Sequence, residues 1–108
     1  MNLQILSWNS QSIRNKIPEL SHHLTNHFYH VIFIQETWLN EKVTIKFPNY
    51  KVIRSDRKIN SRNPHGGVAI LVHFSLDFKV INFCNLDHME TIFIQLSHNN
   101  ETILIGNI

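Results

Sequence analysis

Two apolar runs that each end in polar residues are the feature that most constrains how this chain can fold. The first run spans residues 3–9 and ends at Asn9, and the second spans residues 31–38 and contains Glu36 near its end. Both runs have the pattern of β-strands, and a helical segment lies between them. A strand–helix–strand unit of this length normally places its two strands side by side and parallel. We therefore expect Asn9 and Glu36 to meet at one edge of a sheet.

The segment between the two runs is predicted to be a helix, because its apolar residues recur at three- and four-residue spacing. These residues are Ile13, Ile17, Leu20, Leu24 and Phe28. Ser12 or Asn15 can serve as the N-cap, and Pro18 is tolerated only in the first turn. The helix is therefore expected to begin near Lys16 and to fade at residues 28–30.

Beyond this unit the helical spacing disappears, and five short segments rich in β-branched and aromatic residues predict strands. They are residues 50–54, 67–73, 78–83, 91–96 and 102–105. Turn-forming residues separate them, and Gly66 and Gly67 mark a turn that needs glycine before a strand. The predicted fold class is α/β: one amino-terminal βαβ unit followed by β-hairpins in a sandwich of mixed sheets. Nothing divides the chain, so residues 1–108 are expected to belong to one domain.

The basic residues are concentrated in one short segment. The formal net charge is only +2, yet half of the ten Lys and Arg residues lie within residues 51–62. Such a cluster can contact the phosphates of a nucleic acid, and the candidates are Arg54, Arg57, Lys58 and Arg62. The alternative is an ordinary solvated hairpin loop, which the pattern favours about equally.

The amino terminus runs directly into the first predicted strand, without the basic and apolar regions of a signal peptide. No apolar run reaches membrane-spanning length, and Cys84 is the only cysteine, which excludes an intrachain disulfide. We therefore expect an intracellular protein that does not bind membranes. His23, His27 and His30 share one flank of the predicted helix, where boundary histidines are more common than zinc ligands.

Asn9 and Glu36 are the candidate catalytic residues. A carboxylate at the end of an apolar strand, next to an amide, can hold a hard cation and a phosphate oxygen, and Mg²⁺ favours one or two carboxylates together with waters and phosphates. The alternatives are a solvated glutamate at a strand end and an Asx-turn at Asn9. Together the two residues indicate phosphodiester chemistry, with Glu36 as the metal ligand.

Four segments of the chain resemble the endonuclease/exonuclease/phosphatase superfamily, in the same order and with the same spacing. More narrowly, they are similar to the apurinic-type endonuclease domain at the amino end of non-LTR (LINE- or jockey-like) retrotransposon polyproteins. The segments are residues 6–16, 34–39 (Ile-Gln-Glu-Thr-Trp-Leu), 54–57 and 65–72 (His-Gly-Gly-Val-Ala-Ile-Leu-Val).

This resemblance implies a four-layer α/β/β/α sandwich and Mg²⁺-dependent cleavage of DNA, with Mn²⁺ as an alternative cation. Asn9 would correspond to the active-site asparagine of the family, and Glu36 to its metal-binding glutamate. The nick would expose a 3′ hydroxyl that primes reverse transcription. The implied partner is DNA, the implied location is the nucleus, and the rest of a reverse-transcriptase polyprotein would follow at the carboxyl end.

The chain also departs from the family pattern. The active-site tyrosine would be expected directly after Ile108, followed by an Asp-x-Asn motif, a further aspartate and an Asp-His pair. We therefore interpret residues 1–108 as the amino-terminal half of an endonuclease domain that is inactive by itself. One alternative is another phosphoesterase of the superfamily that also needs its second half. The other is a non-catalytic fragment that binds nucleic acid or protein.

Overall fold

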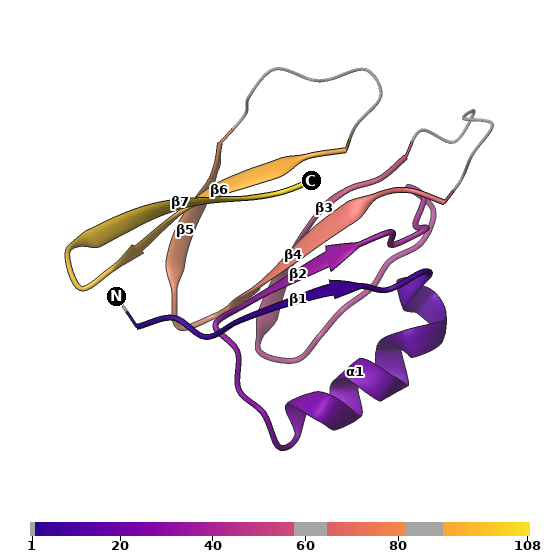
Figure 1. Cartoon of the computed structure of the whole chain (residues 1–108), viewed down its shortest axis with the longest axis horizontal. Helices are drawn as coiled ribbons and strands as arrows, with labels where there is room; N and C mark the ends of the chain where they lie inside the picture. Colours follow the sequence, from indigo (N-terminus) through magenta and orange to yellow (C-terminus); the bar gives the residue numbers. More distant parts are fainter. Residues whose placement is uncertain (1, 58–64, 82–89) are drawn as a thin grey trace.

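Two β-sheets face each other, and a short helix covers the outer side of the first sheet (Figure 1). The structure is a computed structural model that describes residues 2–57, 65–81 and 90–108. Along the chain the elements are β1 (Ile5–Asn9), the 3-10 helix η1 (Ile13–Lys16), α1 (Ile17–Leu24), β2 (Val31–Gln35), β3 (Tyr50–Ser55), β4 (Val68–His73), β5 (Asp77–Ile81), β6 (Ile92–His98) and β7 (Glu101–Asn107). This arrangement confirms the predicted mixed α/β class.

The first sheet has the strand order β1-β2-β4-β3. Strands β1 and β2 are parallel neighbours, as the strand–helix–strand pattern predicts, and Asn9 pairs with Gln35 in their register. Strand β4 is antiparallel to both β2 and β3. Because β4 lies between two strands and two layers, its residues 68–72 are all buried. The sheet is therefore mixed, with the carboxyl ends of β1 and β2 at one edge.

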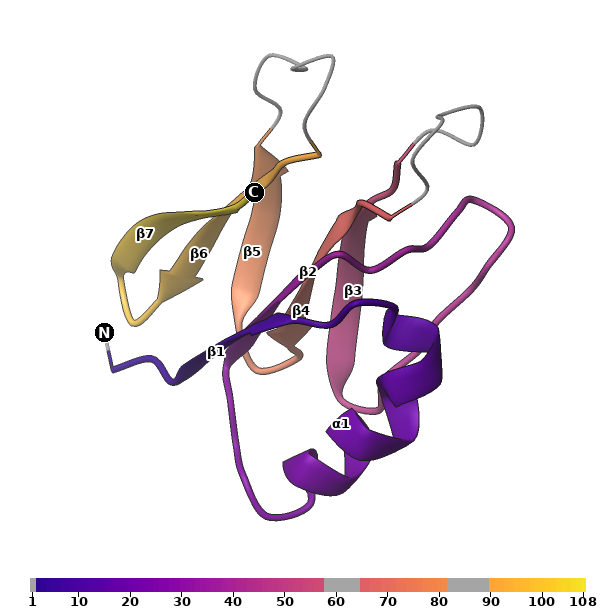
Figure 2. The ribbon, with the colours of Figure 1, turned by 45° about the vertical axis from the view of Figure 1, so that its right-hand side comes forward.

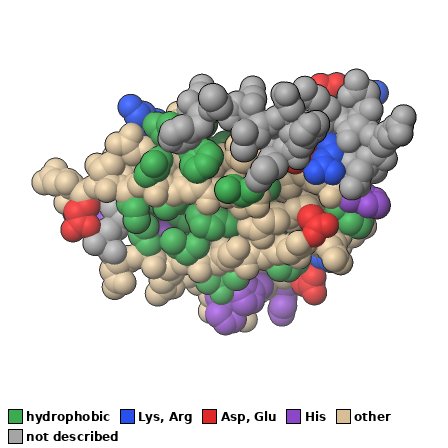
Figure 3. Space-filling view, turned by 45° about the horizontal axis from the view of Figure 1, so that its top comes forward, with side chains coloured by type: hydrophobic (Ala, Val, Ile, Leu, Met, Phe, Trp, Pro, Cys, Tyr) green, Lys and Arg blue, Asp and Glu red, His purple; other side chains and the backbone are tan. Residues whose placement is uncertain are grey.

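The second sheet is antiparallel and has the order β5-β6-β7, and Figure 2 shows it as a separate layer facing the first sheet. Apolar side chains gather near this sheet on the face shown in Figure 3. Its exposed apolar residues include Val80, Ile103 and Leu104. The second sheet thus carries apolar surface that the described residues leave uncovered.

The helical segment begins near Lys16 as predicted, but its capping and its end differ from the prediction. The residue at the N-cap of α1 is Lys16, and neither it nor Ser12 makes a side-chain capping bond, while Pro18 lies in the first turn as predicted. The helix ends at Leu24, earlier than the periodicity indicates. The ring of Phe28 packs edge-on against His30 and His73 at the end of the first sheet, so the chain must leave the helix before reaching it.

Two hydrophobic cores lie on the two faces of the first sheet. One core, between the sheet and the helical segment, contains Ile13, Leu20 and Ile34. The other, between the two sheets, contains Val31, Ile70 and Ile94. Strand β2 contributes to both because successive side chains of a strand point to opposite faces. Within the described residues, no helix is long and apolar enough to cross a membrane.

Candidate functional site

Asn9 and Glu36 lie together at the carboxyl edge of β1 and β2. The Nδ2 group of Asn9 donates a hydrogen bond to Oε2 of Glu36. Asn9 ends β1, and Glu36 directly follows β2, so the parallel register places Asn9 level with Gln35, one residue before Glu36. The juxtaposition is therefore the one that the two strand patterns predict, while the catalytic roles of both residues and the metal-binding role of Glu36 stay predictions.

Glu36 lies on a turn with unusual backbone geometry. Its φ angle is +50°, and that of Trp38 is +56°, a left-handed conformation that side chains other than glycine rarely adopt. Gln11 and Ser12, in the segment that follows β1, also have positive φ angles. Such conformations cost free energy and persist only where neighbouring contacts impose them. The backbone that carries Glu36 is thus held in a defined and strained shape.

Hydrogen bonds from two other segments impose this shape. The backbone N–H of Ser12 donates to the carbonyl oxygen of Glu36 at 3.0 Å. From the other side, the N–H groups of Thr37 and Trp38 donate to the carbonyl oxygens of Gly67 and Gly66, at 3.2 and 2.9 Å. Gly67 itself has φ +93°, which confirms that this turn needs glycine. The Glu36 turn is therefore fixed between the segment after β1 and the segment before β4.

Ser10 is a contributor to the site that the sequence interpretation missed. It is fully buried, and its hydroxyl donates to the carbonyl oxygens of Gln35 at 3.2 Å and Glu36 at 3.0 Å. The Nζ group of Lys16 in turn donates to the carbonyl oxygen of Ser10. The sequence offered one indication of this role, a small hydroxyl residue directly after the end of β1. A serine is common in such places, so only the contact with β2 reveals its role.

The two predicted basic candidates that the structure describes, Arg54 and Arg57, are engaged within the protein. The guanidinium of Arg54 donates to the carboxylate of Asp56 at 2.6–3.1 Å and to the carbonyl oxygens of Val43 and Asn40 at 2.5 and 2.7 Å. These bonds tie the segment after the Glu36 turn to β3. The DNA contact predicted for Arg54 would compete with them.

Arg57 forms an ion pair with Glu90, at 2.8 Å between Nε and Oε1. The hydrogen bond from Arg57 lowers the pKa of the Glu90 carboxyl below its ordinary value, and the same bond raises the pKa of Arg57. The pair links the segment just after β3 to Glu90, two residues before β6. Lys58 and Arg62, the other two predicted DNA contacts, lie outside the described residues.

The donor set at the edge fits part of a magnesium site. Glu36 offers a carboxylate, and Asn9 orients it through Oε2. Carboxylate oxygens are the ligands that Mg²⁺ prefers, usually one or two of them with waters and substrate phosphates completing the shell. Across residues 2–57, 65–81 and 90–108, no group of three or more His, Cys, Asp or Glu side chains converges. One carboxylate is compatible with weak binding of a cation that a phosphate also holds.

The three helix-flank histidines each have other partners. The rings of His23 and His27 stack with centroids 4.1 Å apart, and Nε2 of His23 hydrogen-bonds the hydroxyl of Tyr29 at 2.9 Å. His30 lies beyond the helix, where its Nδ1 accepts the N–H of Gln4 at 3.0 Å. His23 and His27 thus stay side by side as expected, whereas His30 leaves the predicted flank because α1 ends at Leu24.

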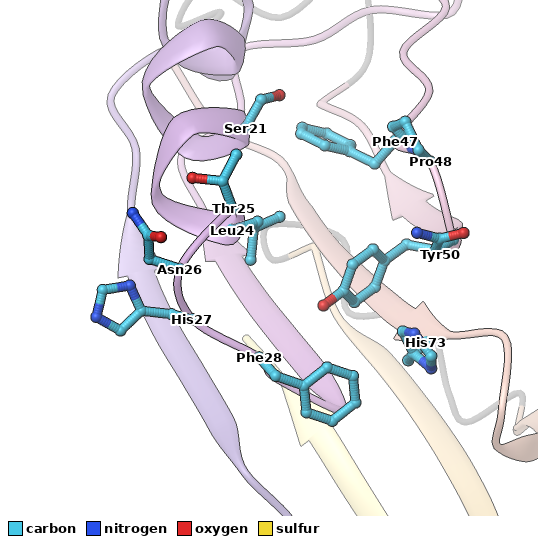
Figure 4. A pocket seen from close by; sticks show the side chains of 11 residues that line it. Ser21, Leu24, Thr25, Asn26, His27, Phe28, Phe47, Pro48, Tyr50 and His73 are labelled. Atoms are coloured by element: carbon cyan, nitrogen blue, oxygen red, sulfur yellow. The ribbon is translucent and has the colours of Figure 1, made fainter.

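A hollow of about 510 Å³ lies at the opposite end of the first sheet from Glu36, between the end of α1 and the start of β3 (Figure 4). Phe28, Tyr50 and His73 supply its aromatic wall, and Ser21 and Thr25 of the helix region line the other side. The hydroxyl of Tyr50 donates to the carbonyl oxygen of Tyr29 at 2.7 Å. The hollow is therefore separate from the Asn9–Glu36 edge.

Comparison with known proteins identifies the protein family of this chain. Residues 6–107 match the family described as endonuclease/exonuclease/phosphatase. The chain therefore belongs to this family. A comparison with curated proteins finds no significant match.

Solved structures share the fold at low sequence identity. An AP endonuclease from Archaeoglobus fulgidus is 21% identical with a TM-score of 0.62, and a 3′–5′ exonuclease from Neisseria meningitidis is 19% identical with a TM-score of 0.62. A 3′ phosphatase from Neisseria, bound to a product DNA hairpin, is 18% identical with a TM-score of 0.59. These matches cover 94–95% of this chain and 40% of each of the other chains. The chain thus spans well under half of the length of these structures.

Proposed function

We propose that this chain is the amino-terminal part of a metal-dependent DNA endonuclease, of the kind that nicks target DNA for a non-LTR retrotransposon. The observation that carries the proposal is the Asn9–Glu36 pair, in which an amide holds a carboxylate at the strand edge of an endonuclease/exonuclease/phosphatase fold. The similar solved structures include an AP endonuclease and a phosphatase bound to DNA, which supports DNA as the substrate. A nuclear location and a following reverse-transcriptase region belong to the same proposal.

In this proposal Glu36 supplies a ligand oxygen for Mg²⁺ or Mn²⁺, and Asn9 fixes the orientation of the carboxylate. The bound cation supplies positive charge that stabilises the phosphate oxygens as water attacks phosphorus. Hydrolysis adds the water oxygen to phosphorus and releases the 3′ oxygen of the neighbouring nucleotide as a hydroxyl. One carboxylate and one amide do not activate the water or protonate the leaving oxygen. We therefore expect the 108-residue chain alone to cleave nothing.

Two other functions remain as alternatives. A phosphoesterase with another substrate is favoured by the similarity to a 3′ phosphatase and a 3′–5′ exonuclease, because a shared fold does not fix the substrate. A non-catalytic DNA-binding fragment would depend on the basic segment. The ion pairs of Arg54 with Asp56 and of Arg57 with Glu90 argue against this second alternative, since both cations already have carboxylate partners.

The test compares nicking of supercoiled plasmid by this chain and by a longer natural chain that contains it. With Mg²⁺ we expect no nicking by the 108-residue chain. The longer chain should nick the plasmid, and Glu36→Gln should reduce the rate by about a hundredfold or more, because the loss of even a residue that only orients a metal ligand costs about 10–100-fold. Glu41→Gln, a change of an exposed carboxylate in the segment after Leu39, is the matched control and should leave the rate unchanged.

Parallel assays on abasic DNA and on a phosphoinositide separate the alternatives. Turnover of the lipid without turnover of either DNA would replace the proposal with the phosphoesterase alternative. Undiminished nicking by the Glu36→Gln longer chain would rule out the assigned site. Nicking by the 108-residue chain that Glu36→Ala abolishes would show that the chain is active alone, against our expectation.

A further inference from the structure

A buried amide joins the two sheets immediately beside the Asn9–Glu36 site. Asn107, the last residue of β7, is only 4% exposed. Its Oδ1 accepts a hydrogen bond from Nε2 of Gln35 at 2.8 Å. Its Nδ2 donates to the carbonyl oxygens of Ile34 at 3.1 Å and Ala69 at 2.9 Å. One side chain of the second sheet thus bonds to two adjacent strands, β2 and β4, of the first.

The residue that Asn107 contacts is central to the candidate site. Gln35 pairs with Asn9 across the parallel strands and directly precedes Glu36. Its carbonyl oxygen accepts hydrogen bonds from both the N–H and the hydroxyl of Ser10. Its Nε2 also lies 3.4 Å from the hydroxyl of Ser7 on β1. A displacement of Gln35 would therefore move both members of the Asn9–Glu36 pair.

Packing alone does not require an amide at this position. Asn107 lies on the same face of β7 as Ile103 and Ile105, because it alternates with them, and Ile105 packs into the apolar core between the sheets. Its cross-strand partner on β6 is the buried Ile92. An apolar residue would suit these neighbours, but it would leave Nε2 of Gln35 with only the longer contact to Ser7. Apolar contacts tolerate sliding, whereas three directional hydrogen bonds fix one relative position of β7, β2 and β4.

We propose that Asn107 is a positioning residue for the Asn9–Glu36 site. By fixing Gln35 and the facing carbonyl groups of β2 and β4, it holds the strained Glu36 turn in the orientation that receives the Asn9 amide and a divalent cation. Because β7 ends at Asn107, the same bonds place the backbone that follows it at the edge that carries Glu36. The cation-related part of this inference rests on the proposed function, and the positional part does not.

The experiment uses NMR spectroscopy of the 108-residue chain and two readouts at Glu36. The first is the pair of side-chain amide signals of Asn9 without metal, which report its bond to Glu36. The second is broadening of the Glu36 signals by Mn²⁺, with MnCl₂ as the probe, which gives the midpoint concentration for binding. For Asn107→Ala we expect displaced Asn9 signals and an Mn²⁺ midpoint raised on the order of tenfold, the lower end of the effect of residues that orient metal ligands.

Controls separate positioning from general destabilisation. Both readouts are taken at a temperature at which circular dichroism shows each variant to be fully folded. Thr102→Ala, an exposed change near the other end of β7, should leave both readouts at the values of the unchanged protein. Gln35→Ala removes the same contact from the other side and should also displace the Asn9 signals. It decides the question if Asn107→Ala does not fold.

The outcomes distinguish this inference from the proposed function. If Asn107→Ala and Gln35→Ala leave the Asn9 signals in place, the positioning role is wrong, even if stability falls. In a second outcome, the Asn9 signals move, but Mn²⁺ either does not broaden the signals of residue 36 or broadens them equally in Glu36→Gln. The positioning role is then supported, and the proposed metal-binding role of the site is wrong. An Mn²⁺ midpoint unchanged by Asn107→Ala in a protein whose Glu36→Gln variant loses binding overturns the cation-related part.

Discussion

His73 ends β4 in a cluster of aromatic rings at the end of the first sheet opposite Glu36. Its ring lies edge-on to Phe28, with centroids 4.9 Å apart, and to Tyr50 at 5.3 Å. Its backbone N–H donates to the carbonyl oxygen of His30 at 2.9 Å, and its Nδ1 lies 2.8 Å from the hydroxyl of Ser75. Burial among these groups lowers the pKa of His73 below its ordinary value, and the nearby His30 lowers it further. The folded protein therefore favours the neutral ring.

This lowered pKa predicts that acid destabilises the protein through His73. In the unfolded chain His73 takes up its proton near pH 6.5, whereas in the folded chain it does so only at lower pH. The unfolded state therefore binds more protons over this interval, and the free energy of unfolding falls as the pH is lowered through it. The stabilisation is complete above pH 6.5 and is lost as the pH falls through the folded-state pKa. Urea unfolding at a series of pH values measures the slope.

His73→Gln should flatten this slope, because it removes the titrating ring. His98→Gln, an exposed change at the end of β6, is the control for the other histidines and should keep the slope of the unchanged protein. Equal slopes in all three proteins would contradict the prediction.

At the scale of the elements, local sequence patterns predicted the strands and the pairing that depend on short stretches of chain. The alternating and apolar runs predicted β1 and β2. The connection rules for a strand–helix–strand unit of this length predicted that the two strands pair in parallel. The same rules brought Asn9 and Glu36 together. The end of α1 was wrong because Phe28, which fits the helical spacing, packs instead against His73, 45 positions further along the chain.

The missing parts of the site depend on contacts that no local pattern contains. Asn107 reaches Gln35 across 72 positions, and Ser10 reaches Glu36 across 26. A weak signal did exist, since the inward-facing residues of β2 and of β7 both end in an amide, Gln35 and Asn107. Pairing those two amides required knowing that β7 lies opposite β2, and sequence alone does not give the packing of two sheets.

The turn before β4 supports a prediction at this scale. Gly67 has φ +93°, and a Cβ atom added there would lie 2.5 Å from Oγ1 of the buried Thr37. Gly67→Ala therefore combines an unfavourable backbone conformation with a collision inside the Glu36 turn. We expect the free energy of unfolding to fall by about 1–3 kcal/mol from the backbone conformation alone. Chemical denaturation followed by far-ultraviolet circular dichroism measures the loss.

Gly66→Ala is the matched comparison, because Gly66 has no positive φ and the three atoms nearest to its added Cβ all belong to the side chain of Arg57. The Arg57 side chain can move aside at the expense of its partly exposed ion pair with Glu90, so the loss should be smaller than for Gly67→Ala. A larger loss at Gly66 than at Gly67 would show that the turn does not depend on the left-handed conformation.

At the scale of the whole molecule, the two hydrophobic cores share strands. Residues 68–72 of β4 are buried on both faces of the first sheet, and β2 supplies Ile34 to one core and Val31 to the other. The second sheet has less support, because it contacts the rest of the described chain mainly through the core between the sheets and the Asn107 bonds. Its exposed apolar residues add nothing to that support. Cooperative unfolding of both sheets therefore depends on the contact between them.

Ile94→Ala tests whether the two sheets unfold together. Ile94 is fully buried on β6 in the core between the sheets, and its truncation should lower the free energy of unfolding by about 2–5 kcal/mol. Trp8 lies in β1, and Trp38 lies in the Glu36 turn that follows β2, so the fluorescence of both tryptophans reports on the first sheet. If the sheets unfold as one unit, the fluorescence transition shifts to lower urea by as much as the circular dichroism transition. Val80→Ala, an exposed change on β5, should shift neither. A circular dichroism transition that moves while the tryptophan transition stays in place would show that the second sheet unfolds separately.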